Sequence, residues 1–452
     1  MSLVSIAAFR FGYGLPAAGA VTAETMLVAL AGPDLAAQAY PMAGISVLGP
    51  LLQQVQLTKM AAKRDKAKDA EFRVVQAEAD QVIGTMARAT FARAIKAEGL
   101  RERLVAFWAD HFTVSAKVLG GIGLPLALVE EAIRPHLTGN FEAMLTAVTL
   151  HPVMVRYLDQ HTSFGPNSPR GRQRNVGLNE NLARELLELH TLGVGAGYSQ
   201  ADVRQMAELL TGISLSKDLK VGFDRRRAEP GAETVLGKDY SGDGMAPIRQ
   251  VLRDLALRPE TAVHIARKLA VHFVADAPDP ALVAAMAEAW MRTGGNLLLV
   301  YRAMLEHPAA WAMPLAKVRQ PYDFIIASLR ALGISGAALM EFEDKAMRRL
   351  IWQALGDMGQ PYKSPRGPDG WAEAAEYWIT PQGLAQRISW AMRAPEQMQR
   401  LGLIGALPDP GALAGAGLGD LASETLLVAA GRAETLAEGV GLVLASPEFN
   451  RR

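Results

Sequence analysis

The sequence predicts an all-α fold, and three observations support this prediction. Apolar residues recur at i, i+3, i+4 and i+7 through most of the 452 residues, which is the pattern of amphipathic helices. The same segments are rich in Ala, Leu, Met, Glu and Arg, which favour helical backbone or tolerate it well. The pattern of strands is confined to one short region. We therefore expect a multi-helix assembly with one small two-stranded β-hairpin near 219–237.

The predicted helices take their boundaries from the apolar period and from residues that begin or end helices. Pro259 suits a first helical position, Ser199 an N-cap, and Gly193 the position after a C-terminus. In chain order the predicted helices cover residues 23–31, 34–40, 50–98, 100–113, 125–137, 139–148, 179–192, 199–211, 245–257, 259–274, 279–293, 296–306, 320–331, 336–355, 380–393, 420–430 and 433–445.

The non-helical segments are a hairpin and two long loops. Residues 220–224 and 234–236 flank the turn-forming run Glu229-Pro230-Gly231, so we expect two strands that pair across this turn. Gly, Pro, Asn and Ser interrupt the helical pattern at 160–178 and 359–371, and loops of this length are often functional.

The predicted domain boundaries follow from the segments that are rich in Gly and Pro. We predict a helical domain over residues 1–400, with a possible sub-boundary near the 160–178 loop. Residues 402–419 have the composition of a linker, so 401–452 is predicted to be a linker and a helical pair that packs on the main domain.

Composition excludes several classes of protein. The net charge is +1 and there is no Cys, which disfavours a dedicated nucleic-acid binder and excludes disulfides, thiolate metal sites and cysteine nucleophiles. The longest charge-free apolar run, 118–129, is much shorter than the ~20 residues that a membrane span needs. Met1 to Gly14 contains no stretch typical of a signal peptide. We therefore expect a cytoplasmic protein without a transmembrane segment.

Several motifs, in order along nearly the whole chain, resemble one known family. The longest is NENLARELLELHTLGV at 179–194, followed by GYSQADV at 197–203; others are RFGYG at 10–14, FWADHFTV at 107–114, IRPH at 133–136, RYLD at 156–159, TVLGK at 234–238, ARKL at 266–269, GDMGQP at 356–361 and SPEF at 446–449. Together they resemble the bacterial DUF1800 family, which is named for its unknown function.

The resemblance implies a helical bacterial protein, often encoded beside an exported partner of the DUF1501 family, which is similar to alkaline phosphatases and sulfatases. It implies no activity. Since this chain lacks the export signal of many relatives, an alternative to a cytoplasmic location is the periplasm, reached by co-export with a partner.

The first candidate site lies on the predicted helix 179–192. Asn181, Glu185 and Glu188 share one stripe of this helix, and two carboxylates on one face can share a proton or bind a cation. Alternatively they are structural, with Arg184 as an ordinary ion-pair partner. We expect both carboxylates to find Arg, His or backbone N–H partners. Glu188 and His190 do not form the Glu-x-x-His motif of di-iron bundles, so no metal is expected.

The second candidate is Asp110-His111, at the end of an aromatic helix. His111 is a candidate general base, or else a half-buried histidine satisfied by a neighbouring group. His264, Lys268 and His272 form a basic stripe. This stripe could contact a phosphate or an acidic partner, but we favour the interpretation that it is a solvated helix face. Basic residues of 59–68, followed by acidic ones, indicate a solvent-exposed or partner-facing helix.

Familiar ligand motifs are incomplete or missing. The run 239–244 begins like an EF-hand loop, but Gln250 stands where the bidentate Glu is required. The chain has no P-loop, H-E-x-x-H or G-x-S-x-G motif. We therefore expect no cofactor.

Two functional hypotheses remain open. The leading one is an accessory protein that binds a partner, such as a DUF1501-like protein, through the 160–178 loop and adjacent helices. The alternative is a hydrolase-like enzyme whose acid–base site combines Asp110, His111, Glu185, Glu188 and His190, with the 359–371 loop beside it. The enzyme hypothesis requires His111 or His190 within hydrogen-bond reach of Glu185 or Glu188 in a solvent-connected pocket.

Overall fold

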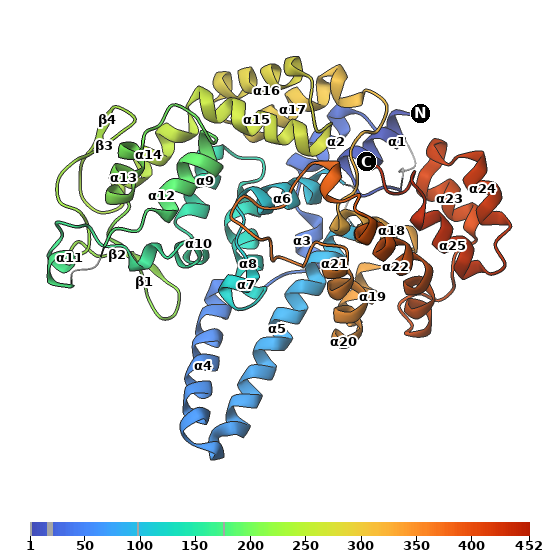
Figure 1. Cartoon of the computed structure of the whole chain (residues 1–452), viewed down its shortest axis with the longest axis horizontal. Coiled ribbons are helices and arrows are strands. Elements are labelled where there is room, and N and C mark those ends of the chain that lie inside the picture. The colour runs from blue at the N-terminus through green and yellow to red at the C-terminus, as the bar shows by residue number, and fades with distance from the viewer. Residues whose placement is uncertain (1, 16–20, 97–98, 175–176) are drawn as a thin grey trace.

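The computed structural model describes residues 2–15, 21–96, 99–174 and 177–452. The described chain is predominantly helical, as predicted (Figure 1). The α-helices of its first half are α1 Leu3–Ile6, α2 Ala23–Ala31, α3 Leu35–Ala39, α4 Ile45–Arg64, α5 Asp69–Lys96, α6 Leu100–His111, α7 Ala116–Leu119, α8 Gly123–Leu128, α9 Phe141–Thr149, α10 Pro152–Tyr157, α11 Pro169–Arg174, α12 Asn181–Glu185 and α13 Gln200–Leu209.

The second half adds α14 Ala246–Ala256, α15 Pro259–Phe273, α16 Pro280–Thr293, α17 Leu297–Glu306, α18 Pro321–Ala331, α19 Gly336–Glu341, α20 Asp344–Met347, α21 Gln353–Asp357, α22 Pro381–Arg400, α23 Pro410–Leu418, α24 Glu424–Gly431 and α25 Leu436–Ala445. Several helices continue into π-helical turns, namely η1 Ala7–Phe11, η3 Val129–Ile133, η6 Leu186–Thr191 and η8 Arg348–Trp352. Such turns are often found at functional sites.

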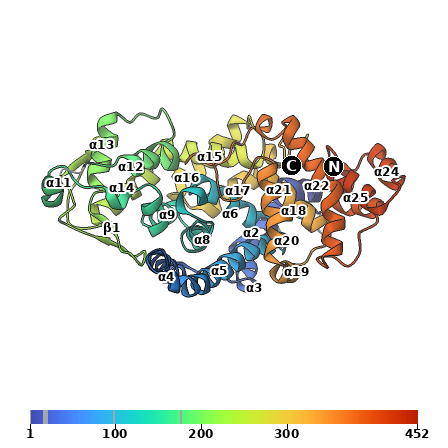
Figure 2. The ribbon, with the colours of Figure 1, turned by 60° about the horizontal axis from the view of Figure 1, so that its bottom comes forward.

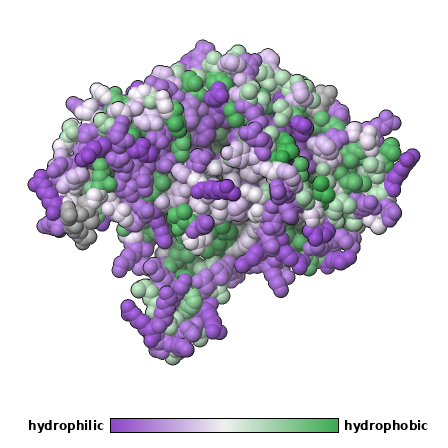
Figure 3. Space-filling view, viewed as in Figure 1, coloured by the Kyte–Doolittle hydropathy of each residue, from purple (hydrophilic) through white to green (hydrophobic). Residues whose placement is uncertain are grey.

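The predicted single helix 50–98 is wrong, because the chain reverses after Arg64. Asp65 has extended backbone, and its side chain accepts a hydrogen bond from the Ala67 N–H. The two resulting helices, α4 and α5, pack against each other through Leu51, Val75 and Ala79. The reversal buries an apolar stripe that one long helix leaves exposed. The α4–α5 hairpin projects from the body (Figure 1), and its tip is largely hydrophilic (Figure 3).

The predicted helix 336–355 is also divided. Phe342 and Glu343 have extended backbone between α19 and α20, and the chain then runs through η8 into α21. Conversely, α22 continues to Arg400, beyond its predicted end at 393. Residues 410–418, inside the segment expected to be a linker, form α23.

The small β element is present near the predicted place, with different pairing. Strand β2 (Val221–Phe223) pairs with β1 (Ile213–Leu215), while β3 (Glu233–Val235) pairs with β4 (Lys238–Tyr240). The two predicted strands therefore do not pair across the turn at 229–231. Residues between them bind the 160–178 segment instead, since the N–H groups of Gly165 and Arg170 donate to carbonyl groups of Arg227 and Arg226. The expectation that 160–178 is a loop is only partly correct, because it contains α11 and a 3₁₀ turn at Gln160–Thr162.

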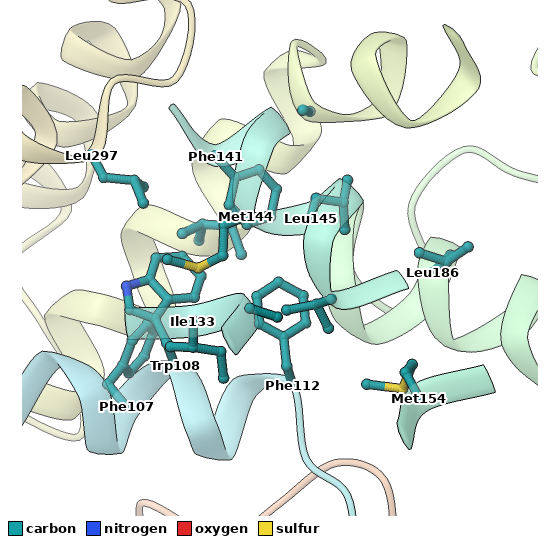
Figure 4. Packing of buried hydrophobic residues seen from close by; sticks show 14 of the residues in the cluster. Phe107, Trp108, Phe112, Ile133, Phe141, Met144, Leu145, Met154, Leu186 and Leu297 are labelled. Atoms are coloured by element: carbon teal, nitrogen blue, oxygen red, sulfur yellow. The ribbon is translucent and has the colours of Figure 1, made fainter. Parts of the chain in front are cut away.

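Two large hydrophobic clusters form the core. The first includes Trp108, Phe112, Phe141 and Leu186 (Figure 4), and the second includes Phe324, Trp390 and Phe449. Both views of the ribbon place α11 and α24 at opposite ends of the body (Figures 1 and 2). Trp352 and Tyr362 contact both clusters, and the main candidate site lies beside Tyr362. Among the described residues, no helix is long and apolar enough to cross a membrane.

Candidate functional site

A cavity of about 110 Å³ lies between the two hydrophobic clusters. The segment 359–374 covers it and crosses in front of α6 in Figure 1. Residues 359–371 contain neither helix nor strand, as predicted. The charged and titratable side chains that line the cavity come from α6, α15, α18, this segment and the turn after η3; they are Glu102, Asp110, Arg134, His272, Tyr322, Asp323, Tyr362, Lys363 and Glu373.

Asp110, a predicted site residue, lies in the cavity wall at the end of α6. Its carboxylate accepts the N–H of Trp371, with Oδ1 at 3.0 Å. Burial and the nearby charge of Glu373 raise its pKa to about 7, although Lys268 opposes them. The neighbouring Gly370 has φ +81°, and an added Cβ there would be 2.7 Å from the Asp110 carbonyl oxygen. Only glycine therefore fits this close approach of the loop to α6.

Lys363, which lines the cavity with Asp110, and Lys268, which does not, carry positive charges that act on Asp110. Burial lowers the pKa of Lys363 to about 8 and also lowers that of Lys268. Lys363 adopts a left-handed conformation with φ +52°, and its carbonyl oxygen accepts the Ala116 N–H at 2.7 Å. Within the described ranges, neither Nζ forms a hydrogen bond or a close ion pair with a side chain. Both ammonium groups are nevertheless near enough to Asp110 to lower the pKa of its carboxyl group.

A buried ionic network anchors the loop beside these lysines. His272 Nδ1 donates to Glu373 Oε1 at 2.5 Å, and Lys317 Nζ lies 3.1 Å from Glu373 Oε2. Arg103 donates to the other nitrogen of His272 and pairs with Asp323 at 2.6 Å. Arg452 also pairs with Asp323 and with Glu373, at 3.1 and 3.4 Å. The network fixes Glu373, and with it the end of the covering segment, to α15, α18 and the last residue.

The favoured interpretation of His264, Lys268 and His272 as a solvated face is wrong. His272 is only 6 % exposed, and the other two side chains are partly buried. His272 belongs to the ionic network, the charge of Lys268 acts on Asp110, and His264 lies 3.3 Å from the Leu189 carbonyl oxygen. The i, i+4, i+8 pattern identified one helix face correctly, but packing against α6 and η6 buries that face.

The predicted residues His111 and His190 lie behind the cavity wall, in an aromatic environment. Each is 2 % exposed. The rings of Phe107 and Phe112 lie against His111, and the His111 Nε2 is 3.3 Å from the His190 carbonyl oxygen. Burial and Lys268 lower the pKa of both histidines, that of His190 to about 3. Both imidazoles are therefore neutral at pH 7.

Glu185 and Glu188 lie on α12 and η6, the segment that also carries His190, and both are half-buried. Glu188 Oε1 accepts a hydrogen bond from Arg184 at 3.0 Å. Glu185 forms no hydrogen bond or ion pair with the described residues, contrary to expectation. Burial, Glu188 and Asp369 raise its pKa to about 7, so the carboxyl group is half protonated rather than paired.

The five predicted site residues are therefore divided between two places. Asp110 lines the cavity, whereas no hydrogen bond joins His111 or His190 to Glu185 or Glu188 in the part of the chain that the structure describes. No group of three or more His, Asp and Glu in that part has an arrangement that suits a metal ion. In the EF-hand-like run, Asp239 Oδ1 accepts a hydrogen bond from Thr234 across the β3–β4 pair.

Sequence reasoning missed the two residues that complete the cavity, Lys363 and Glu373. Lys363 lies in the 359–371 loop, whose length and Gly and Pro content were the available signal. Glu373 lies just beyond that loop and belongs to no motif that was singled out. Neither residue stands at a regular distance in the sequence from other charged residues, so no pattern predicts which side chains it contacts.

Comparison with known families supports the resemblance seen in the motifs. The model of the family described as "Protein of unknown function (DUF1800)" matches residues 7–451. Comparisons with curated proteins and with solved structures found no match. Since the match spans nearly the whole chain and includes the cavity, the loop that covers it and the ionic network except for Arg452, the chain belongs to the DUF1800 family.

Proposed function

We propose that the protein is a hydrolase-like enzyme that performs acid–base chemistry in the cavity beneath residues 359–374. The observation that supports this most is Asp110, a carboxyl group that lines the cavity with a pKa of about 7. General acids and bases work best when their pKa is near the working pH, and active sites reach this by burial and neighbouring charge.

In this proposal Asp110 transfers the proton. When protonated it donates to the leaving group of a substrate, and when ionised it accepts a proton from an attacking water. The Trp371 N–H fixes the carboxylate, so that the acid is held in one orientation. The network around Glu373 supports the loop that limits access of bulk water. His111 and His190 contribute neutral, buried packing behind Asp110 and do not transfer protons.

The proposal is tested first without a substrate, by ¹³C NMR titration of the Asp carboxyl groups. The Asp110 signal, assigned with Asp110→Asn, is expected to titrate near pH 7. The same titration of the Asp110→Asn variant identifies the signal by its loss and serves as the control. Titration of Asp110 near 4 refutes the proposal.

The second arm is activity on a panel of chromogenic esters, phosphate esters and glycosides. Asp110→Asn is expected to remain folded and to lose any activity found, with a rate loss of at least about 10²-fold. An Asp110→Asn variant that is as active as the natural protein on a hydrolysed substrate contradicts the proposed role.

The projecting hairpin favours a second candidate function, the binding of a partner protein. Leu57, Met60 and Val74 are 59 %, 47 % and 69 % exposed on α4 and α5. Exposed basic residues lie around them, including Lys59 and Lys63. The partner that fits is a DUF1501-like protein with acidic side chains around an apolar contact. In this role the protein travels to the periplasm with the partner, whereas alone it stays in the cytoplasm.

The hairpin is favoured over the 160–178 loop as the docking element. Polar side chains of 160–178 already have partners within the protein. Arg170 pairs with Asp224 at 2.8 Å, and Asn167 binds Glu229. The hairpin tip has no comparable internal partners among the described residues for its lysines.

The test is calorimetric titration with a purified protein of the DUF1501 family. Leu57→Ser with Met60→Ser is expected to weaken binding at least tenfold without lowering Tm. Val428→Ser changes an apolar residue of similar exposure, 45 %, on α24, and serves as the matched control. Absence of binding, or equal binding by both variants, refutes this candidate.

A further inference from the structure

One face of α6 runs along the whole length of the cavity. The residues of α6 that line the cavity recur at i, i+3, i+4, i+7 and i+8, which is the period of a single helix face. They are Glu102, Val105, Ala106, Ala109 and Asp110. At about 1.5 Å per residue, Glu102 and Asp110 are separated by roughly 12 Å along the helix axis. The cavity is therefore elongated along α6, with one carboxyl group at each end.

The two carboxyl groups differ in their partners. Both oxygens of Glu102 accept hydrogen bonds from Arg134, each at 2.8 Å, and Arg134 also donates to Asp34. This end of the cavity is closed by a buried ion pair whose charges balance. At the other end, the Asp110 carboxylate accepts a hydrogen bond only from the Trp371 N–H among the described residues. A polar group of a ligand therefore finds its partner at the Asp110 end.

The walls between these ends are mostly apolar. On α6 the large side chains face the hydrophobic core and are at most 3 % exposed; they are Leu104, Phe107 and Trp108. The cavity face instead carries two alanines, Ala106 and Ala109, which are partly exposed. The other apolar and aromatic walls are Met42, Leu126, Val129, Leu355, Tyr322 and Tyr362. The small side chains on α6 leave open a space that a larger residue would fill.

We propose that the apolar part of the cavity binds the acyl chain of an uncharged ester, and that this chain is short and unbranched. This inference rests on the proposed function of the cavity and specifies its substrate class. The ester group lies beside Asp110, and the alcohol part extends past Trp371, which is partly exposed.

The volume of the cavity sets the length of the chain. A cavity of about 150 Å³ holds the six carbon atoms of benzene, so that a cavity of about 110 Å³ holds about four. Because this volume extends along roughly 12 Å of α6, the cavity is narrow, which suits an unbranched chain. The acyl group that fits is therefore about as large as a butyryl group.

The reaction on such a substrate is ester hydrolysis. Water adds to the carbonyl carbon, and the ionised Asp110 accepts a proton from this water as the new C–O bond forms. The bond between the carbonyl carbon and the alcohol oxygen then breaks, and Asp110 returns the proton to that oxygen. The products are a carboxylic acid and an alcohol. Val105, Ala106 and Ala109 contribute affinity by burying the chain and take no part in the proton transfer.

The first test measures binding without hydrolysis, by ligand-observed NMR titration of the full chain with acetamide, butyramide and hexanamide. Burial of each methylene strengthens binding about fourfold, so butyramide is expected to bind at least tenfold more tightly than acetamide. Hexanamide is expected to bind no more tightly than butyramide, because the cavity ends at the Glu102–Arg134 pair. Absence of saturable butyramide binding, equal binding of acetamide and butyramide, or a further gain with hexanamide refutes the chain subsite.

Substitutions in the cavity wall give the second test. Ala106→Leu fills the cavity and is expected to weaken butyramide binding at least tenfold. Ala303→Leu changes a partly buried alanine of α17 that does not line the cavity, and as the matched control it leaves binding unchanged. Equal butyramide binding by these two variants refutes the subsite.

A third variant keeps the test decisive where Ala106→Leu fails to fold. Val129→Ala removes two methyl groups from the opposite wall and lengthens or widens the cavity. It is expected to strengthen hexanamide binding at least threefold relative to the natural protein. An unchanged or weaker affinity for hexanamide in this variant refutes the subsite.

Two combinations of results separate this inference from the proposed function. Butyramide binding that Ala106→Leu blocks, together with an Asp110 that titrates near pH 4, confirms the chain subsite and refutes Asp110 as the acid. An Asp110 that titrates near pH 7 without butyramide binding refutes the chain subsite and supports the acid. On chromogenic esters, kcat/KM is expected to be at least tenfold higher for the butyrate than for the acetate. Activity on glycosides or phosphate esters alone, lost in Asp110→Asn, refutes the ester assignment and supports Asp110.

Discussion

Replacing Glu373 with Gln tests the network that holds the covering loop over the cavity. Gln keeps the shape of the side chain and removes the charge that His272, Lys317 and Arg452 share. Burial raises the pKa of Glu373, but His272 and Lys317 lower it more, so that it falls from 4.5 to about 2. The side chain is 21 % exposed, so solvent screens these interactions only in part.

The size of the effect follows from linkage. One pKa unit corresponds to about 1.4 kcal/mol, so the change from 4.5 to about 2 corresponds to roughly 3 kcal/mol at pH 7. An unfolding entropy of about 2.1 cal/mol/K per residue gives about 1 kcal/mol/K for 452 residues. When the chain unfolds as one unit, Tm is therefore expected to fall by about 3 °C.

The assay is thermal unfolding of the natural protein and Glu373→Gln between pH 7 and pH 3. Because the folded pKa is the lower one, the stabilisation is complete above pH 4.5 and is lost as the pH falls toward 2. The difference in Tm must therefore shrink below pH 4.5. Glu376→Gln, at an exposed position on the same segment, is the matched control. A pH-independent difference, or a loss equal to that of the control, refutes the reasoning.

Three further substitutions test the cavity and its surroundings. Asp110→Asn is expected to raise Tm at pH 8 and not at pH 3.5, because a pKa raised from 3.8 to about 7 makes the folded state lose stability as the pH rises through this window; a lower Tm at pH 8 contradicts this. His190→Asn is expected to lower Tm at pH 8 and less so at pH 5, because a pKa lowered from 6.5 to about 3 provides stability that is lost as the pH falls below 6.5. Differential scanning calorimetry measures Tm for both variants. A difference in Tm that stays constant with pH argues against a buried neutral imidazole at His190. Gly370→Ala is expected to lower Tm more than Gly359→Ala does. The added Cβ at Gly370 meets Asp110, whereas Gly359, at φ +96°, has nothing within 4 Å of an added Cβ; an equal loss of Tm in the two variants shows that the loop does not need this close approach.

Local features of the sequence predicted much of the secondary structure. Ser199 is the N-cap of α13 and accepts the Asp202 N–H, Pro259 begins α15, and Gly193 has φ +95° after η6. Each of these outcomes depends on residues within a few positions, so the sequence pattern contains the necessary information. The all-α class and Asp110 as a candidate site residue came from the same kind of pattern.

The meeting of Asp110, Lys363 and Glu373 in one cavity wall was decided only by the tertiary structure. Asp110 lies on α6 and the other two residues lie in a segment far along the chain, and their proximity depends on which helix faces the two hydrophobic clusters bury. The same cause explains the correction at α4–α5, where the two helices pack through their apolar sides. Helical periodicity is a short-range property that identifies a face, whereas burial is a property of the whole chain that determines what that face meets.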